Sequence, residues 1–77
     1  MALIRHFKPK QIDRMSLHQE IQASYAVHEV DGRVLLQIDS YGRKDRKFPD
    51  KISQSFQLDQ VGATALFKIL KDSFGLK

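Results

Sequence analysis

The segment YGRKDRKFPDK, residues 41–51, combines the residue types that could contact a polyanion. Lys and Arg side chains neutralise phosphates and release counterions, and aromatic rings offer faces on which unpaired bases stack. An ordinary polar connection between two strands has a similar composition, with Asp45 and Asp50 cancelling part of the charge. The basic residues of the segment are Arg43, Lys44, Arg46, Lys47 and Lys51, and the interleaved aromatic residues are Tyr41 and Phe48.

The other polar residues indicate no catalytic or metal-binding role, so we expect a protein that is not an enzyme and needs no cofactor. The chain has no cysteine, and its 4 glycines form neither a Walker pattern nor a dinucleotide fingerprint. The histidines His6, His18 and His28 are scattered, and no serine occupies a nucleophile elbow. Asp39 and Asp45 lack a third acid at a spacing that would hold a metal ion.

The length and charge of the chain indicate one small basic domain. In 77 residues a single hydrophobic core is only marginally stable, and neither disulfides nor a structural zinc site can strengthen it. Association with a second copy is the remaining obvious route to stability, so we expect a homodimer. The 13 Lys and Arg residues against 9 Asp and Glu residues give a net charge of +4, which favours anionic partners.

The start of the sequence, MALIRHFKPKQ, has too short an apolar run for a secretory signal or a membrane span of about 20 residues. We therefore expect a soluble cytoplasmic protein without membrane partners, with association with the nucleoid as an alternative. Residues 1–14 are basic and show no clear period, and we interpret them as a partly ordered N-terminal arm. A short helix that starts near Pro9, with Ile12 and Met15 on one side, is the competing interpretation.

Three segments after this arm show the two-residue period of half-buried strands. The first begins near Ile21, and the dipeptide Asp31-Gly32 that follows it is typical of a two-residue hairpin turn. The second, at 33–41, must therefore fold back antiparallel, and the third covers 51–58. Their apolar faces hold Ile21, Ala23, Tyr25, Val27, Val34, Leu36, Ile38, Ile52, Phe56 and Leu58, and the opposite faces hold Leu35, Gln37, Asp39, Tyr41, Ser53, Ser55 and Gln57.

A helix from Gln60 to Phe74 is predicted after the third strand, with Asp59 as its N-cap and Gly75 as its stop. Residues 15–77 thus form one α+β domain, an antiparallel sheet of three or four strands followed by one C-terminal amphipathic helix. The apolar arc of the helix is wider than contact with such a sheet requires, so part of it should meet a two-fold partner. The expected dimer interface consists of Leu66, Phe67, Leu70 and Phe74.

From Ser24 to Phe74 this arrangement resembles the single-stranded-DNA-binding domain of the transcriptional coactivator called positive cofactor four, and its small bacterial and phage relatives. The resemblance rests on the order of the elements more than on identity, and Ala63 and Ser55 stand where the family commonly has a tryptophan and a glycine. The matching segments are Asp31-Gly32-Arg33-Val34, LLQIDSY at 35–41, the basic loop with Pro49, and Phe56-Gln57-Leu58-Asp59.

The resemblance implies a curved sheet, dimerisation through the helices, and a groove that binds unpaired DNA with little sequence preference. It implies a first strand near Met15 to Glu20, and it makes Arg33 at the hairpin turn an extension of the positive surface. By the same resemblance, Lys44, Arg46, Lys47 and Lys51 would contact phosphates, and Tyr41 and Phe48 would stack on bases.

We therefore expect a homodimeric single-stranded nucleic-acid-binding module, for DNA or RNA, that acts in transcription or other DNA transactions. The alternative is a small protein-interaction or regulatory module that binds no nucleic acid, in which basicity serves solubility or an acidic protein partner.

Overall fold

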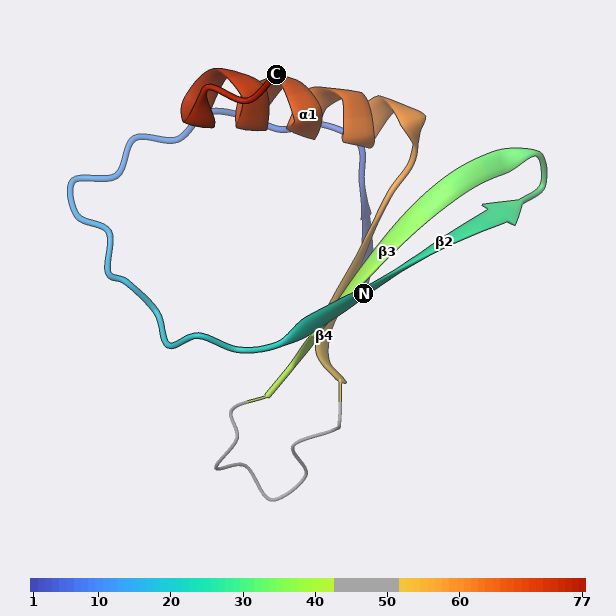
Figure 1. Cartoon of the computed structure of the whole chain (residues 1–77), viewed down its shortest axis with the longest axis horizontal. Coiled ribbons are helices and arrows are strands. Elements are labelled where there is room, and N and C mark those ends of the chain that lie inside the picture. The colour runs from blue at the N-terminus through green and yellow to red at the C-terminus, as the bar shows by residue number, and fades with distance from the viewer. Residues whose placement is uncertain (43–51) are drawn as a thin grey trace.

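The computed structural model describes residues 1–42 and 52–77, which form a four-stranded sheet followed by one helix (Figure 1). The sheet has the strand order β1-β4-β3-β2, in which β1 and β4 are parallel and the other two pairs are antiparallel. The expected α+β fold with a mostly antiparallel sheet and a C-terminal helix is thus confirmed. The elements are β1 (Ala2–Ile4), β2 (Ala23–Val30), β3 (Arg33–Tyr41), β4 (Ile52–Leu58) and α1 (Gln60–Phe74).

The hairpin between β2 and β3 forms at the dipeptide that predicts it. Asp31 and Gly32 have φ angles of 52° and 76°, the positive values that a two-residue turn of this kind requires. Val30 pairs with Arg33 directly across the turn. The first three residues of β3 pair only with β2, because the pairing of β3 with β4 begins at Leu36. The tip of the hairpin therefore extends beyond the rest of the sheet (Figure 1).

The start of the chain differs from the sequence-based expectation. Ala2–Ile4, in the range expected to be an arm, form β1 and pair with residues 56–58 of β4. Residues 5–22 then lead to the opposite edge of the sheet without a helix or strand. The alternative helix near Pro9 and the strand implied near Met15 to Glu20 are therefore both wrong. A strand of three residues at the edge of a sheet is too short to show the two-residue period. The sequence around Ala2–Ile4 therefore does not predict β1.

The strand register separates an apolar face of the sheet from a polar one. Leu36 and Ile38 of β3 pair with Leu58 and Phe56 of β4, whereas Gln37 pairs with Gln57 and Asp39 with Ser55. The alternation predicted for β3 is therefore confirmed. In β4 the alternation ends at Gln54. A register shift near Ser40 and Tyr41 skips Ser53, so Ile52 pairs with Tyr41. The expectation that Ile52 lies with Phe56 and Leu58 is wrong for this reason.

Helix α1 begins and ends as its capping residues predict. The side chain of Asp59 accepts a hydrogen bond from the backbone N–H of Gly62 at 3.0 Å, which satisfies an orphan donor of the first turn. Gly75 has a left-handed φ of 66°, and its N–H donates to the Lys71 carbonyl oxygen. The expected N-cap and C-terminal stop are both confirmed.

The best-buried part of the molecule is the junction of β4 and α1. Leu58 is 2% exposed and Asp59 5% exposed, and Gly62 is also buried. A Cβ atom on Gly62 would overlap the carbonyl oxygen of Ile4, so only glycine lets the first turn of the helix approach β1 this closely. The helix is therefore fixed to the sheet mainly at its N-terminal end.

The rest of the chain is open. Its accessible surface is 7469 Å², whereas a compact monomer of this mass exposes about 4,800 Å². Its radius of gyration is 14.7 Å, against about 11.5 Å expected for a compact chain of 77 residues. Leu58 is the one hydrophobic residue that is buried within the described ranges. In those ranges no helix combines the length and apolar character needed to cross a membrane.

Candidate nucleic-acid interface

Four polar side chains form a hydrogen-bonded row across the two central strands. We call Gln37, Asp39, Ser55 and Gln57 the polar row. Asp39 accepts from Ser55, and its Oδ1 also accepts from Nε2 of Gln37 at 3.0 Å. Nε2 of Gln57 donates to Oε1 of Gln37 at 3.0 Å. The row is half-buried and joins β3 to β4 through side chains in addition to the backbone ladder.

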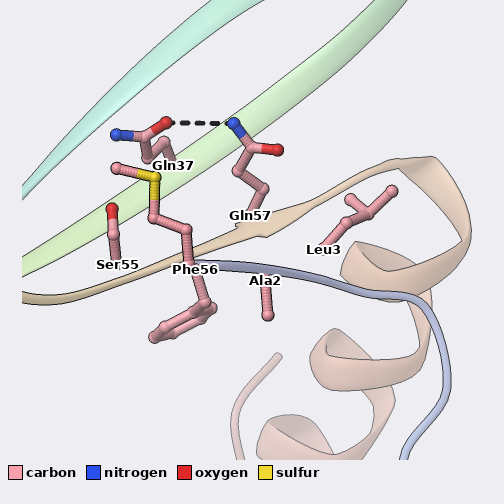
Figure 2. Close-up of a pocket in the computed structure, with 7 residues that line it drawn as sticks. Ala2, Leu3, Gln37, Ser55, Phe56 and Gln57 are labelled. Carbon is pink, nitrogen blue, oxygen red and sulfur yellow. Dashed lines mark hydrogen bonds between the residues drawn. The ribbon is translucent and has the colours of Figure 1, made fainter.

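The polar row lies on the face of the sheet opposite to α1. Figure 2 shows Gln37, Gln57 and Ser55 pointing to one side of the strands and Phe56 to the other, the side on which the helix lies. Leu58, two residues after Phe56 on the same strand face, is buried near the first turn of α1. The helix therefore covers part of the apolar face and leaves the polar row accessible.

A shallow hollow of about 180 Å³ is lined in part by three residues of the polar row, Gln37, Ser55 and Gln57. The start of β1 forms one wall and β4 the other, and Gln37 reaches it from β3 (Figure 2). Its lining combines polar and apolar side chains. The lining residues are Met1, Ala2, Leu3, Gln37, Ser55, Phe56 and Gln57.

Tyr41 continues the same face at the end of β3. Its hydroxyl lies 2.9 Å from Oγ of Ser24, and Ser24 pairs across the strands with Asp39. This hydrogen bond holds the half-buried phenol ring beside the polar row. A ring fixed in this way loses little conformational entropy when a base stacks on it, which is the chemistry expected of Tyr41 from the sequence.

Arg33 and Tyr41 are not brought together. They are the first and last residues of β3, so about 26 Å of extended strand separates them within one protomer. Arg33 is exposed at the projecting hairpin tip. Any contact of Arg33 with a ligand held near Tyr41 would require a ligand that follows the whole strand.

Most of the expected phosphate contacts lie outside the described residues. Tyr41 and Gly42 come directly before the basic segment 43–51. The polar face therefore ends next to the densest positive charge in the sequence. The candidate residues outside the described ranges are Arg43, Lys44, Arg46, Lys47, Phe48 and Lys51.

The residues expected at a dimer interface lie on the free part of α1. Leu66 is half-buried, whereas Phe67, Leu70 and Phe74 are 57%, 37% and 72% exposed. The polar side chains of α1 are exposed as well, so polar and apolar sides of the helix are both open in the single chain. The water-facing residues are Gln60, Thr64, Lys68, Lys71 and Asp72.

Arg5, a basic residue of the expected arm, forms an ion pair within the chain. Nε of Arg5 lies 2.9 Å from Oδ2 of Asp59. The N–H of Gly62 and then the Arg5 guanidinium hold the pKa of the Asp59 carboxyl below its ordinary value of 3.8, although desolvation opposes them. Arg5 is therefore better described as a residue that stabilises the start of α1 than as one that contacts phosphates.

Sequence reasoning found the polar positions of the interface but missed how they are connected. The two-residue period predicts Gln37, Asp39, Ser55 and Gln57 on the strand faces opposite to the apolar ones. The bond between Asp39 and Ser55 depends on the register of β3 against β4, which no local pattern reveals. The contribution of β1 to the hollow had no sequence signal.

No family model matches the sequence, and no match was found among the curated proteins or among the solved structures compared with it.

Proposed function

We propose that the protein is a homodimeric module that binds single-stranded nucleic acid, with its polar face toward the bases and its basic segment toward the phosphates. The observation that supports this most directly is the mainly polar face of β3 and β4. It carries the polar row and the fixed ring of Tyr41, and it ends where the basic segment 43–51 begins. Unpaired bases stack on aromatic side chains, and positive charge beside such a surface binds the phosphates of the strand.

Duplex DNA fits this surface less well. In a duplex the bases are stacked and paired, so a ring such as that of Tyr41 has no free base face to contact. A preference for unpaired strands therefore follows from the chemistry of the proposed interface.

Self-association is part of the proposal because the protomer buries so little apolar surface. The exposed apolar side of α1 and the excess accessible surface are what a protomer shows when a partner completes its core. Dimerisation would also place two polar faces and two basic segments in one particle. Two linked sites on one strand raise the apparent affinity without new contacts.

A protein-interaction module without nucleic-acid binding is the second candidate. The same exposed apolar residues of α1 favour it, since an unpaired helix face can receive another protein. The two candidates differ in what the polar face and the basic segment do. Only the first predicts that unpaired DNA binds more tightly than duplex DNA.

Fluorescence anisotropy with a labelled oligonucleotide and its duplex, at low and moderate salt, tests the proposal. We expect tighter binding of the single strand and weaker binding at higher salt. In the triple variant Lys44→Ala, Arg46→Ala, Lys47→Ala, the slope of log affinity against log salt should decrease by about 2 per protomer, because three phosphate contacts are lost.

The matched control is Lys68→Ala, Lys71→Ala, Lys77→Ala, which removes the same charge from α1 and the residues after it. Its salt slope should remain close to that of the native chain. Absence of binding, or equal weak binding of both DNA forms that survives the change at 44, 46 and 47, would refute nucleic-acid binding at this interface and favour the second candidate.

A further inference from the structure

The polar row has a fixed hydrogen-bond direction. A carboxylate can only accept hydrogen bonds, so the amide of Gln37 must present its NH₂ group to Asp39. Its carbonyl oxygen then faces Gln57, which must present its own NH₂ group in turn. Asp39 thereby sets the orientation of the Gln37 amide on β3 and, through it, that of the Gln57 amide on β4.

This direction leaves oxygen acceptors available to a ligand. Oε1 of Gln57 and Oδ2 of Asp39 have no hydrogen-bond partner within residues 1–42 and 52–77. Both belong to half-buried side chains on the accessible face of the sheet. Oε1 of Gln57 is directed away from Gln37 (Figure 2). The row therefore selects ligand groups that donate hydrogen bonds.

The negative charge of the Asp39 carboxylate is unexpected at a surface proposed to bind a polyanion. A negative charge there repels phosphates and lowers affinity for every sequence equally. Its partners in the described ranges are the neutral side chains Gln37 and Ser55, which leave that charge in place. The cost is offset if the carboxylate accepts hydrogen bonds from a base.

Guanine is the base that suits such a site. Its Watson–Crick edge carries two adjacent donors, the N1–H and the exocyclic N2 amine, and unpaired bases are recognised on this edge. Adenine and cytosine place a ring acceptor next to their one amine, and thymine has a single N–H between two carbonyl groups. These acceptors would face the Asp39 carboxylate, whose Oδ2 can accept from both guanine donors because Gln37 and Ser55 donate to Oδ1. We propose that the polar row recognises guanine in the bound strand, an inference that rests on the proposed function.

The test compares oligodeoxythymidine strands that carry isolated deoxyguanosine, deoxyinosine or deoxyadenosine at the same positions. Isolated guanines avoid four-stranded structures. We expect the guanine strand to bind about tenfold more tightly than oligodeoxythymidine, the effect of one good two-donor contact. Inosine keeps N1–H but lacks the N2 amine, so its strand should bind with intermediate affinity. The adenine strand should bind like oligodeoxythymidine.

The variant Asp39→Asn replaces the acceptor-only group with an amide of the same shape and should abolish the preference for guanine. Asp72→Asn removes the same charge from the exposed side of α1 and should keep the preference. Circular dichroism melting verifies that both variants are folded. The comparison of strands on the native chain needs no variant.

The outcomes separate the inference from the function on which it rests. Equal binding of all strands with preserved selectivity for unpaired DNA would overturn guanine recognition and leave the proposed function intact. A preference for guanine that persists in Asp39→Asn would also overturn the role of the polar row. Failure of every strand to bind would refute the proposed function, and guanine recognition with it.

Discussion

Nε of Arg5 and Oδ2 of Asp59 lie 2.9 Å apart, and this ion pair connects the residue that follows β1 to the N-cap of α1. Asp59 thus serves two elements: one oxygen accepts from the Gly62 N–H inside the helix, and the other faces the Arg5 guanidinium. The carboxylate is almost fully buried, with its side chain 6% exposed, whereas that of Arg5 is 51% exposed. The stability of this junction should therefore depend on the charge of one acid.

Acidification should weaken the contribution of Asp59 to stability. Its pKa is lower in the folded chain than its ordinary value of 3.8, so the unfolded chain binds the proton more readily. The contribution is complete above pH 3.8 and is lost as the pH falls through the lower folded-state pKa. In Asp59→Asn the cap is kept and the charge is lost, so the melting temperature should be lower than that of the native chain near neutral pH.

Thermal melting from about pH 6 to about pH 2 measures this effect. The difference in melting temperature between the native chain and Asp59→Asn should shrink below pH 3.8. Asp72→Asn, at an exposed helix position, is the control and should follow the native chain. A difference that stays constant over the whole range would contradict the assignment to Asp59.

Gly62→Ala should destabilise the protein, although alanine favours a helix interior by about 0.8–1.0 kcal/mol over glycine. The new methyl group would overlap the Ile4 carbonyl oxygen, so β1 or the first helical turn must move. The melting temperature should fall, and the amides of β1 should exchange faster with solvent. Thr64→Ala, at an exposed position of the same helix, should change stability by no more than about 0.5 kcal/mol. A raised melting temperature in Gly62→Ala would show that the close approach is absent.

Phe67→Glu combined with Phe74→Glu should prevent self-association. Both rings are exposed in the protomer, and burying a carboxylate in an apolar interface is costly. Sedimentation velocity should show a dimer for the native chain and a monomer for the variant. The melting temperature of the native chain should rise with protein concentration, and that of the variant should not.

Gln60→Glu combined with Thr64→Glu introduces the same charge on the water-facing side of α1. This control should remain dimeric. A native chain that sediments as a monomer at all accessible concentrations would rule out the homodimer, and a dimer that survives the change at 67 and 74 would place its interface elsewhere.

Tyr41 should contribute to binding through its ring and to stability through its hydroxyl. Tyr41→Ala should weaken single-strand binding by about 1–3 kcal/mol, the usual loss when one base-stacking ring is removed. Tyr41→Phe keeps the ring and loses the hydrogen bond to Ser24, so it should cost about 0.5–1.5 kcal/mol of stability at most. Anisotropy and thermal melting measure the two effects. Equal loss of affinity in both variants would argue against stacking.

Local chemistry explains why the hairpin and the helix could be predicted from the sequence. Asp31-Gly32 accepts positive φ, and Asp59 and Gly75 satisfy the helix ends, so the signals lie within a few residues of the structure that they specify. The two-residue period of β3 fixed its two faces in the same way. These elements need no information from distant parts of the chain.

The missed features all depend on contacts between distant residues. β1 is three residues long, and its partner in β4 lies far along the chain, so neither length nor period indicates it. The shift that moves Ile52 opposite Tyr41, and the pairing of Asp39 with Ser55, follow from how β4 aligns with β3. Alternation along one strand shows which residues share a face, but it does not show which residues meet across the sheet.

The parallel pairing of β1 with β4 also determines an order of assembly. Ala2 pairs with Phe56, so this edge can form only after a loop of more than fifty residues has closed, whereas β2 and β3 meet across a two-residue turn. Contacts between residues this far apart form late and slow the search for the native state. The strand that comes first in the sequence is thus expected to join the sheet last. Until it does, one edge of β4 is open to other chains at high concentration.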